Sequence, residues 1–297
     1  MDIDHDGGPF EPLPSRVLTT WAPGTSLENI AVRNDGMIAV SIQSEGEIEE
    51  IDRADWKQRR LAKLPVPIAG LAYDAFKNLW VAAGVPHQPP GMIWRVSKDG
   101  ELALWCGIED AELLNGMCVT PDGSGLLVAE SFTGRIHWVN MLEPQTRVWL
   151  IEDQLKPVSG TRTAGANGIK IWNDRAVISV SDRNKLFEIG LSAAGEAGPM
   201  RVLAEHLRAD DFAIDPEGTL YLATHRMNSV VRLTRDGKRT TIGGPQQGLV
   251  GATAAAFGRT GDDADTLYVV TNGGRHALYE GQMQDAKLVA IDVKPGK

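Results

Sequence analysis

The sequence is 297 residues long, with a formal net charge of −9 and 42% hydrophobic residues. This length suits one large domain or two ordinary ones. No apolar run reaches the roughly 18 residues of a membrane-spanning helix, and no basic run is present that could neutralise phosphates. We therefore expect a globular protein with no nucleic-acid or membrane partner and a small-molecule ligand, and a monomer is plausible.

The N-terminal segment MDIDHDGGPFEPLPS is acidic and rich in glycine and proline. It has neither the basic start nor the apolar stretch of a secretory signal. We expect residues 1–15 to be a tail that precedes one domain, residues 16–297. Without a targeting segment, a cytoplasmic protein and a secreted protein whose signal has been removed are both consistent with the sequence.

A strand–turn–strand phrase recurs about every 40–50 residues, a period typical of repeat folds. Each copy has a short apolar strand, a tight turn and a second apolar strand. Because one such unit cannot bury its faces alone, the pattern indicates a β-propeller. We predict an all-β, six-bladed β-propeller with four antiparallel strands per blade. The copies are ENIAVRNDGMIAVS from Glu28, GLAYDAFKNLWVAA from Gly70, NGMCVTPDGSGLLVAES from Asn115, NGIKIWNDRAVISVS from Asn167, DDFAIDPEGTLYLATH from Asp210 and GATAAAFGRTGDDADTLYVVTNGG from Gly251.

Alternation and turn residues predict the individual strands. In the third blade these are 116–120, 126–130, 136–140 and 146–151, with one helical turn before them at 111–114. In the fifth they are 212–215, 220–224, 230–234 and 239–242. The sixth blade has only three strands of its own, ending at 287–293. We expect 16–21 to supply its outer strand, because N-terminal closure spares exposed sheet edges.

The two cysteines, Cys106 and Cys118, fall on the outer strand of one blade and the inner strand of the next. We expect two free thiols, which behave as small buried hydrophobic residues.

Four blades open with an oxygen-bearing side chain: Glu28, Asn115, Asn167 and Asp210. In antiparallel blades these positions share one face with the loops after the second strands, which contain His87, Ser131, Asp182, His225 and Asn272. Two carboxylates brought together without a cation would be costly. Two carboxylates and two amide oxygens suit Ca²⁺ best, with Mg²⁺, Mn²⁺ or Zn²⁺ also possible. Taken singly, Asn-Gly and Asp-Asp at strand starts are also ordinary loop residues.

In order and spacing, the repeated phrases resemble the regucalcin, gluconolactonase and luciferin-regenerating-enzyme superfamily, six-bladed propellers related to paraoxonases and strictosidine synthases. The resemblance spans nearly the whole chain, from ENIAVRNDG to TLYVVTNGG. It implies that Glu28, Asn115, Asn167 and Asp210 bind one central divalent metal. Asp211 occupies the next position, where some relatives place another ligand.

The chain departs from this family at one informative position. Sugar-lactone hydrolases of the family usually carry an arginine two residues before the third-blade asparagine, and here that residue is Leu113. With Met117 nearby, we expect an apolar rim and a substrate more apolar than a sugar lactone. We interpret His87, Leu113, Met117, Asp182 and Asp211 as substrate-binding candidates, with a loop-capping role as the equal alternative for Asp182.

The leading hypothesis is a metal-dependent lactonase or esterase. The metal would polarise the ester carbonyl, and either Asp210 or His225 would accept the proton of the attacking water. The phrases LENIAVR and LYVVTNGG also resemble propellers of biosynthetic pathways, some of which are associated with hetero-Diels–Alder cycloaddition. A non-hydrolytic cyclising enzyme and a non-enzymatic ligand-binding propeller are therefore the alternatives. No nucleophile elbow, phosphate loop or dinucleotide fingerprint is present, which argues against a serine hydrolase and against nucleotide cofactors.

Overall fold

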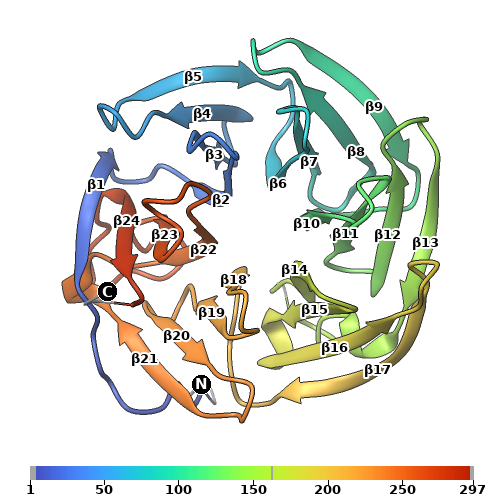
Figure 1. Ribbon diagram of the computed structural model, residues 1–297. Coiled ribbons are helices and arrows are strands. Elements are labelled where there is room, and N and C mark those ends of the chain that lie inside the picture. Colours follow the sequence, from blue (N-terminus) through green and yellow to red (C-terminus); the bar gives the residue numbers. More distant parts are fainter. Residues whose placement is uncertain (1–4, 162, 295–297) are drawn as a thin grey trace. The chain divides into compact units, whose positions relative to one another are not determined.

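The computed structural model of the protein describes residues 5–161 and 163–294. In these residues the strands form six antiparallel sheets of four strands each, which is the fold class of a six-bladed β-propeller (Figure 1). The described helical segments are three short 3₁₀ turns, and no described helix is long and apolar enough to cross a membrane. The 3₁₀ turns are η1 (Asp153–Leu155), η2 (Ser181–Arg183) and η3 (Pro245–Gln247).

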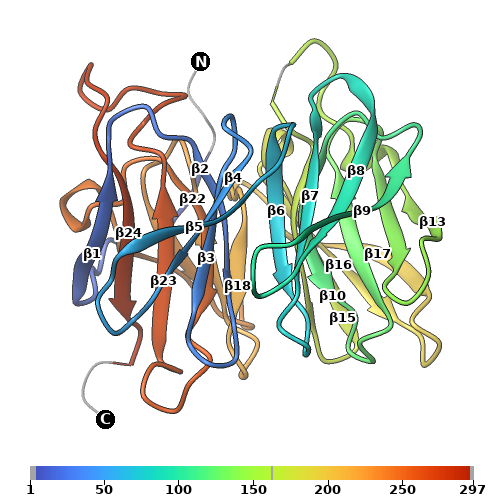
Figure 2. The same cartoon turned by 90° about the horizontal axis from the view of Figure 1, so that it is seen from above.

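The chain divides into two compact units, and the first contains His5 and Leu64–Ala209. It holds three sheets, and the innermost strand of each contacts that of the next, β6 against β10 and β10 against β14 (Figure 1). Figure 2 shows β6, β7 and β8 of this unit from a second direction. Its strands are β6 (Ile68–Tyr73), β7 (Leu79–Val85), β8 (Gln88–Val96), β9 (Leu102–Ile108), β10 (Leu114–Val119), β11 (Gly125–Glu130), β12 (Arg135–Asn140), β13 (Thr146–Ile151), β14 (Ala166–Trp172), β15 (Arg175–Val180), β16 (Lys185–Leu191) and β17 (Ala197–Ala204).

The second unit contains Asp6–Lys63 and the chain from Asp210 onward. It holds the other three sheets, in which β22 contacts both β2 and β18. Its strands are β2 (Leu27–Val32), β3 (Ile38–Ile42), β4 (Glu47–Ile51), β5 (Gln58–Lys63), β18 (Phe212–Ile214), β19 (Leu220–Ala223), β20 (Val230–Leu233), β21 (Arg239–Gly243), β22 (Ala252–Phe257), β23 (Thr266–Thr271), β24 (Ala286–Asp292) and β1 (Ser15–Trp21).

The N-terminal strand closes the last sheet, as the sequence predicts. β1 pairs antiparallel with β24, from Ser15 opposite Ile291 to Trp21 opposite Ala286. The segment before β1 is also ordered against a sheet, because the backbone N–H groups of Glu11 and Leu13 donate to carbonyls of β21 at 2.9 Å each. Part of the expected tail therefore lies along the edge of the fifth blade.

The hairpin between β10 and β11 shows why its residues turn. Asp122 Oδ1 accepts hydrogen bonds from the Thr120 hydroxyl at 2.6 Å and from the Ser124 backbone at 3.2 Å. Gly123 has a φ of +71°, a left-handed conformation that glycine adopts without steric cost. The predicted Asp-Gly turn chemistry is present here.

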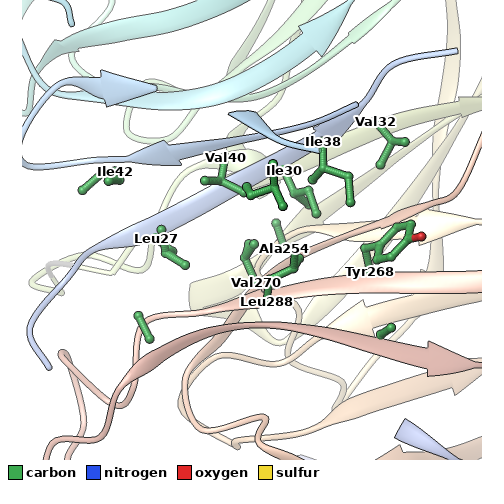
Figure 3. Packing of buried hydrophobic residues seen from close by; sticks show 13 residues of the cluster. Leu27, Ile30, Val32, Ile38, Val40, Ile42, Ala254, Tyr268, Val270 and Leu288 are labelled. Atoms are coloured by element: carbon green, nitrogen blue, oxygen red, sulfur yellow. The ribbon is translucent and has the colours of Figure 1, made fainter. Parts of the chain in front are cut away.

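The core of the second unit includes a cluster between its first and last sheets (Figure 3). Leu27 and Ile38 meet Tyr268 and Leu288, and each of the four is at most 1% exposed. Burying a large apolar side chain contributes roughly 1.5–3 kcal/mol. Such inter-sheet packing is what a single blade cannot provide.

The structure lacks the helical turn expected before the third blade, and it places the two cysteines on the predicted strands. Residues 111–114 do not form a helical turn, because the backbone N–H groups of Glu112 and Leu113 donate to the carboxylate of Glu130 instead. Cys106 and Cys118 are not disulfide-bonded and are half-buried, and they lie on β9 and β10, the predicted outer and inner strands.

Candidate functional site

Most inner strands depart from regular pairing near their first residues. The pairing register shifts there in five of the six sheets, and Glu28, Asn115 and Asn167 each lie inside such a shift, whereas the pairing of β18, which follows Asp210, is regular. An extra residue at such a shift bends a strand and re-aims a side chain, and it is frequent next to functional sites. The three shifts around Glu28, Asn115 and Asn167 lie between Leu27 and Ile30, between Leu114 and Met117, and between Ala166 and Ile169.

In the first unit, a serine fixes the orientation of the Asn115 amide. Asn115 Nδ2 lies 3.2 Å from Ser131 Oγ, and that hydroxyl donates to the backbone carbonyl of Ala166 at 2.8 Å. Because the only hydroxyl hydrogen is used on Ala166, the serine oxygen accepts from Asn115. The amide nitrogen therefore faces the serine and Oδ1 is directed away from it.

Asn167 repeats this arrangement one sheet further on. Its Nδ2 donates to Ser181 Oγ at 3.0 Å, and the hydroxyl donates to the carbonyl of Ala209 at 2.7 Å. Asn115 and Asn167 are both buried, at 5% and 4% exposure. Both amides therefore turn the nitrogen toward a serine and the oxygen away from it.

The glycine that follows Asn115 allows its strand to approach the next one closely. A Cβ atom on Gly116 would lie 2.5 Å from the backbone oxygen of Asn167. Any larger residue would separate β10 from β14 at this level. The Asn-Gly pair thus places Asn115 and Asn167 at equivalent points of two closely packed inner strands.

The second unit contributes three acidic residues at the corresponding positions. Burial, followed by the negative charges of Asp210 and Asp211, raises the pKa of Glu28 well above its ordinary value. The Glu28 side chain nevertheless keeps some solvent-accessible surface. Asp211 has internal partners, since it accepts hydrogen bonds from Asn29 Nδ2 at 2.9 Å and from the Phe212 backbone at 2.8 Å. Glu28, Asp210 and Asp211 therefore lie close enough to interact electrostatically.

Asp210 also contacts the histidine that the sequence proposed as a second proton acceptor. Its Oδ2 lies 3.1 Å from His225 Nδ1, and the two side chains are 9% and 16% exposed. His225 Nε2 lies 3.0 Å from Asn272 Nδ2. The structure therefore brings Asp210 and His225 together and adds Asn272. The sequence placed Asn272 in a loop on the same face but predicted no role for it.

Ser131, Ser181 and His225 occupy the same position of the repeat. Two residues after Asn115, Asn167 and Asp210, the inner strand pairs with a residue of the second strand. Ser131, Ser181 and His225 each stand three residues after that paired residue. An alignment of the repeats on these pairs identifies Ser181 as the counterpart of Ser131. Ser181 was not among the candidate residues proposed from the sequence. The pairs are Met117 with Val128, Ile169 with Ile178, and Phe212 with Leu222.

His87 lies in an exposed loop of the first unit and packs on an aromatic ring. Its imidazole stacks on Phe132 with ring centroids 4.2 Å apart and an interplanar angle of 21°. Its Nδ1 lies 3.2 Å from Glu112 Oε2, and its side chain is 59% exposed. Leu113, next to Glu112, is half-buried. His87, Phe132 and Leu113 belong to neighbouring loops that Glu112 and Glu130 connect.

Two other substrate-binding candidates, Met117 and Asp182, make contacts that indicate structural roles. Met117 is 2% exposed and packs in the core with Trp80 and Val128, because the register shift at the start of β10 changes which face the residue meets. Asp182 Oδ2 accepts hydrogen bonds from the Val158 backbone at 2.6 Å and the Thr161 hydroxyl at 2.8 Å. These positions support a core role for Met117 and the loop-capping alternative for Asp182.

Glu130 is a buried residue that sequence reasoning missed. Its Oε1 accepts hydrogen bonds from the backbones of Glu112 at 3.2 Å and Leu113 at 3.0 Å, and its Oε2 accepts from Phe132 at 3.2 Å. The backbone and hydroxyl of Thr133 also donate to Oε2. One carboxylate at 0% exposure thus fixes the loops that carry Leu113 and Phe132.

The donor chemistry fits a hard cation. Among residues 5–161 and 163–294, no three His, Cys, Asp or Glu side chains are grouped in a way that could hold a metal ion. The expected ligand set differs from such a group, because half of it consists of amide oxygens. Carboxylate and amide oxygens are the ligands that Ca²⁺ prefers. The serine-imposed orientation of Asn115 and Asn167 is consistent with that use.

Together, the six four-stranded antiparallel sheets define a six-bladed β-propeller. The chain belongs to the SMP-30/gluconolactonase/LRE-like family, whose model matches residues 79–273. The family resemblance inferred from the sequence is confirmed.

Two curated relatives have similar sequences. A protein of Sarocladium schorii, provisionally named hetero-Diels-Alderase asR5, is 24% identical over 89% of this chain and 79% of its own length. A protein of Phoma sp, provisionally named hetero-Diels-Alderase, is 22% identical over 88% of this chain and 87% of its own length.

Solved structures show the same fold at low identity. A luciferin-regenerating enzyme has a TM-score of 0.74 at 15% identity, covering 94% of this chain and 95% of its own. Regucalcin of Agrobacterium tumefaciens, described as a calcium-binding protein, has a TM-score of 0.73 at 19% identity, covering 97% of each chain. A gluconolactonase of Xanthomonas campestris has a TM-score of 0.71 at 15% identity, covering 97% and 98%.

Proposed function

We propose that the protein is a divalent-cation-dependent hydrolase of a lactone or related ester that is more apolar than a sugar lactone. The observation that carries the proposal is the common orientation of two buried amides, Asn115 and Asn167, by Ser131 and Ser181. Buried polar side chains aligned in this way at re-aimed strand starts favour a ligand-binding role over ordinary loop chemistry.

In this proposal Glu28, Asn115, Asn167 and Asp210 bind one cation. The raised pKa of Glu28 supports it, because like charges brought together with burial favour either a proton or a cation. Ca²⁺ is the expected ion, and Mg²⁺, Mn²⁺ and Zn²⁺ are the alternatives to test. When bound, the cation supplies Lewis-acid polarisation of an ester carbonyl.

The protein's own residues move the protons. Asp210 accepts a proton from water as the water oxygen bonds to the ester carbonyl carbon. The same proton then passes to the alkoxide oxygen as the ester C–O bond breaks, which yields an acid and an alcohol. His225 is at hydrogen-bond distance from Asp210, with Nδ1 3.1 Å from Oδ2.

The first unit supports an apolar substrate. Leu113 stands where sugar-lactone hydrolases of the family usually carry arginine, and the stacked pair of His87 and Phe132 offers an aromatic surface in a neighbouring loop. Neither Leu113 nor Phe132 supplies the fixed charge that a polyhydroxylated acid would need.

A second candidate is non-hydrolytic chemistry of the cyclisation or hetero-Diels–Alder type. Both curated relatives carry provisional names of this kind. The same apolar loops would then hold a reactive substrate in a folded conformation. A ligand-binding propeller without catalysis is the remaining alternative.

Proton release from aliphatic, aromatic and sugar lactones tests the proposal. The protein is first treated with a chelator, and Ca²⁺, Mg²⁺, Mn²⁺ or Zn²⁺ is then added back. We expect cation-restored hydrolysis, lost in folded Asp210→Asn and Glu28→Gln variants. Leu113→Arg should move the preference toward sugar lactones. Activity that survives both Asp210→Asn and Glu28→Gln would refute the proposal. Absence of hydrolysis by protein that is shown to hold a cation would favour cycloaddition or ligand binding.

A further inference from the structure

We propose that Asn272 fixes the tautomer of His225, and that His225 in this form positions the carboxylate of Asp210. The inference deepens the proposed function and rests on it for the use of Asp210 as a ligand and proton acceptor. All three residues belong to the second unit.

The orientation of the Asn272 amide is set by the turn that follows it. Asn272 Oδ1 accepts hydrogen bonds from the backbone N–H groups of Gly274 at 3.1 Å and Arg275 at 3.3 Å. The oxygen is therefore directed to the turn, and the amide nitrogen is the atom 3.0 Å from His225 Nε2. Since an amide nitrogen only donates, Nε2 must carry the lone pair.

A neutral imidazole with a bare Nε2 carries its hydrogen on Nδ1. That nitrogen lies 3.1 Å from Asp210 Oδ2, so it donates to the carboxylate. Asn272 is 1% exposed, which shields its bond to the ring from competing water. The chain Asn272–His225–Asp210 therefore has one direction, with each side-chain N–H donating to the next member.

The backbone and a second histidine restrict the His225 ring. The His225 backbone N–H donates to the carbonyl of Ala252 at 2.7 Å, and its φ of +51° places it in a tight turn. The ring of His276 meets the His225 ring edge to face, with centroids 5.6 Å apart. Little freedom remains for the imidazole to turn its Nδ1 away from Asp210.

This arrangement makes His225 a positioning residue. The lone pair that a general base would need is already engaged by Asn272. His225 also occupies the repeat position of Ser131 and Ser181, which orient the two amides. Asp210 is thus the proton acceptor that the geometry favours, and His225 is the partner that orients it.

Nitrogen-15 NMR of histidine-labelled protein tests the tautomer directly, without substrate and without metal. We expect an unprotonated Nε2 in the wild-type protein and a protonated Nε2 in the isosteric variant Asn272→Asp, whose carboxylate can only accept. Asn228→Asp is the matched control, because the Asn228 side-chain oxygen accepts from the Gly251 backbone at 2.9 Å and an aspartate can accept in the same way. A protonated Nε2 in the wild-type protein, or an unchanged Nε2 in Asn272→Asp, would overturn the inference.

Two substitutions at His225 test positioning through cation affinity. An asparagine amide can place a donor near the Nδ1 position, whereas a glutamine amide reaches the Nε2 position. We expect Ca²⁺ affinity within about 3-fold of wild type for His225→Asn and a loss of roughly 10–100-fold for His225→Gln. Equal affinities in folded proteins would contradict positioning. A wild-type protein that shows the expected tautomer but binds no divalent cation would refute the metal site and leave the tautomer assignment standing.

Discussion

The hydroxyl of Ser131 accepts the side-chain N–H of Asn115 at 3.2 Å while donating its own hydrogen to the carbonyl of Ala166 at 2.8 Å. Because the serine hydroxyl hydrogen is donated to Ala166, its oxygen can only accept from Asn115. The Asn115 amide nitrogen therefore faces the serine, and the amide oxygen is the end that remains for a ligand. An alanine at this position would leave the amide free to turn.

Ser131→Ala and Ser181→Ala should weaken Ca²⁺ binding by roughly 10–100-fold each, the usual effect of removing a group that orients a metal ligand. The loss of stability should be smaller, about 1 kcal/mol per lost hydrogen bond. Calorimetric titration and urea unfolding measure the two effects separately. Ser229→Ala is the control, since Ser229 is buried and its hydroxyl, in the described part of the chain, is hydrogen-bonded to Thr224. Undiminished affinity in both variants would show that the serines do not orient ligands.

Glu130→Gln should destabilise the first unit by about 2–4 kcal/mol. The amide would turn a hydrogen-bond donor toward backbone N–H groups that need an acceptor, in a place with no solvent to compensate. Hydrogen exchange should show lost protection at the amides of Leu113 and Phe132 before global unfolding. Glu143→Gln is the control, because Glu143 is exposed and, among the described residues, its carboxylate accepts from the Gln145 side chain. Unchanged exchange at these amides would mean that other contacts hold the loops.

His137 makes stability depend on pH. It lies on β12 at 2% exposure, and its Nε2 is buried without a hydrogen-bond partner among the described residues. Burial is the main cause that lowers the pKa of His137 from 6.5 to about 4. Between these values the unfolded chain binds the proton and the folded protein does not, so the free energy of unfolding falls as the pH drops through this window. Over the window this contribution is about 3 kcal/mol.

Replacing this histidine removes the titrating group and tests the assignment. In His137→Phe the difference from wild type in unfolding free energy should change between pH 6.5 and pH 4 and stay constant above pH 7. Urea unfolding at several pH values measures it. A difference that is independent of pH would place the source of acid sensitivity elsewhere.

The strands and turns could be predicted from the sequence because they depend on neighbouring residues. The alternation of 126–130 and the Asp122-Gly123 turn are local, and the structure has both. Met117 shows the limit of such reasoning. Alternation places it on the side of Asn115, but the register shift after Leu114 breaks the alternation and buries it. Glu130 shows another limit, because its partners Glu112 and Leu113 are brought to it only by the folded loop.

The N-terminal segment should stabilise the second unit in two separable steps. Removing residues 1–13 deletes backbone hydrogen bonds from Glu11 and Leu13 to β21 and one from Thr241 to Pro9, and should cost about 1–4 kcal/mol. Removing residues 1–21 also deletes β1 and leaves β24 as a long unpaired edge, which promotes association between chains. We expect the shorter deletion to remain monodisperse and the longer one to aggregate, as measured by urea unfolding and light scattering. If both truncated proteins matched the full chain in stability and dispersity, pairing of β1 with β24 would not contribute to stability in solution.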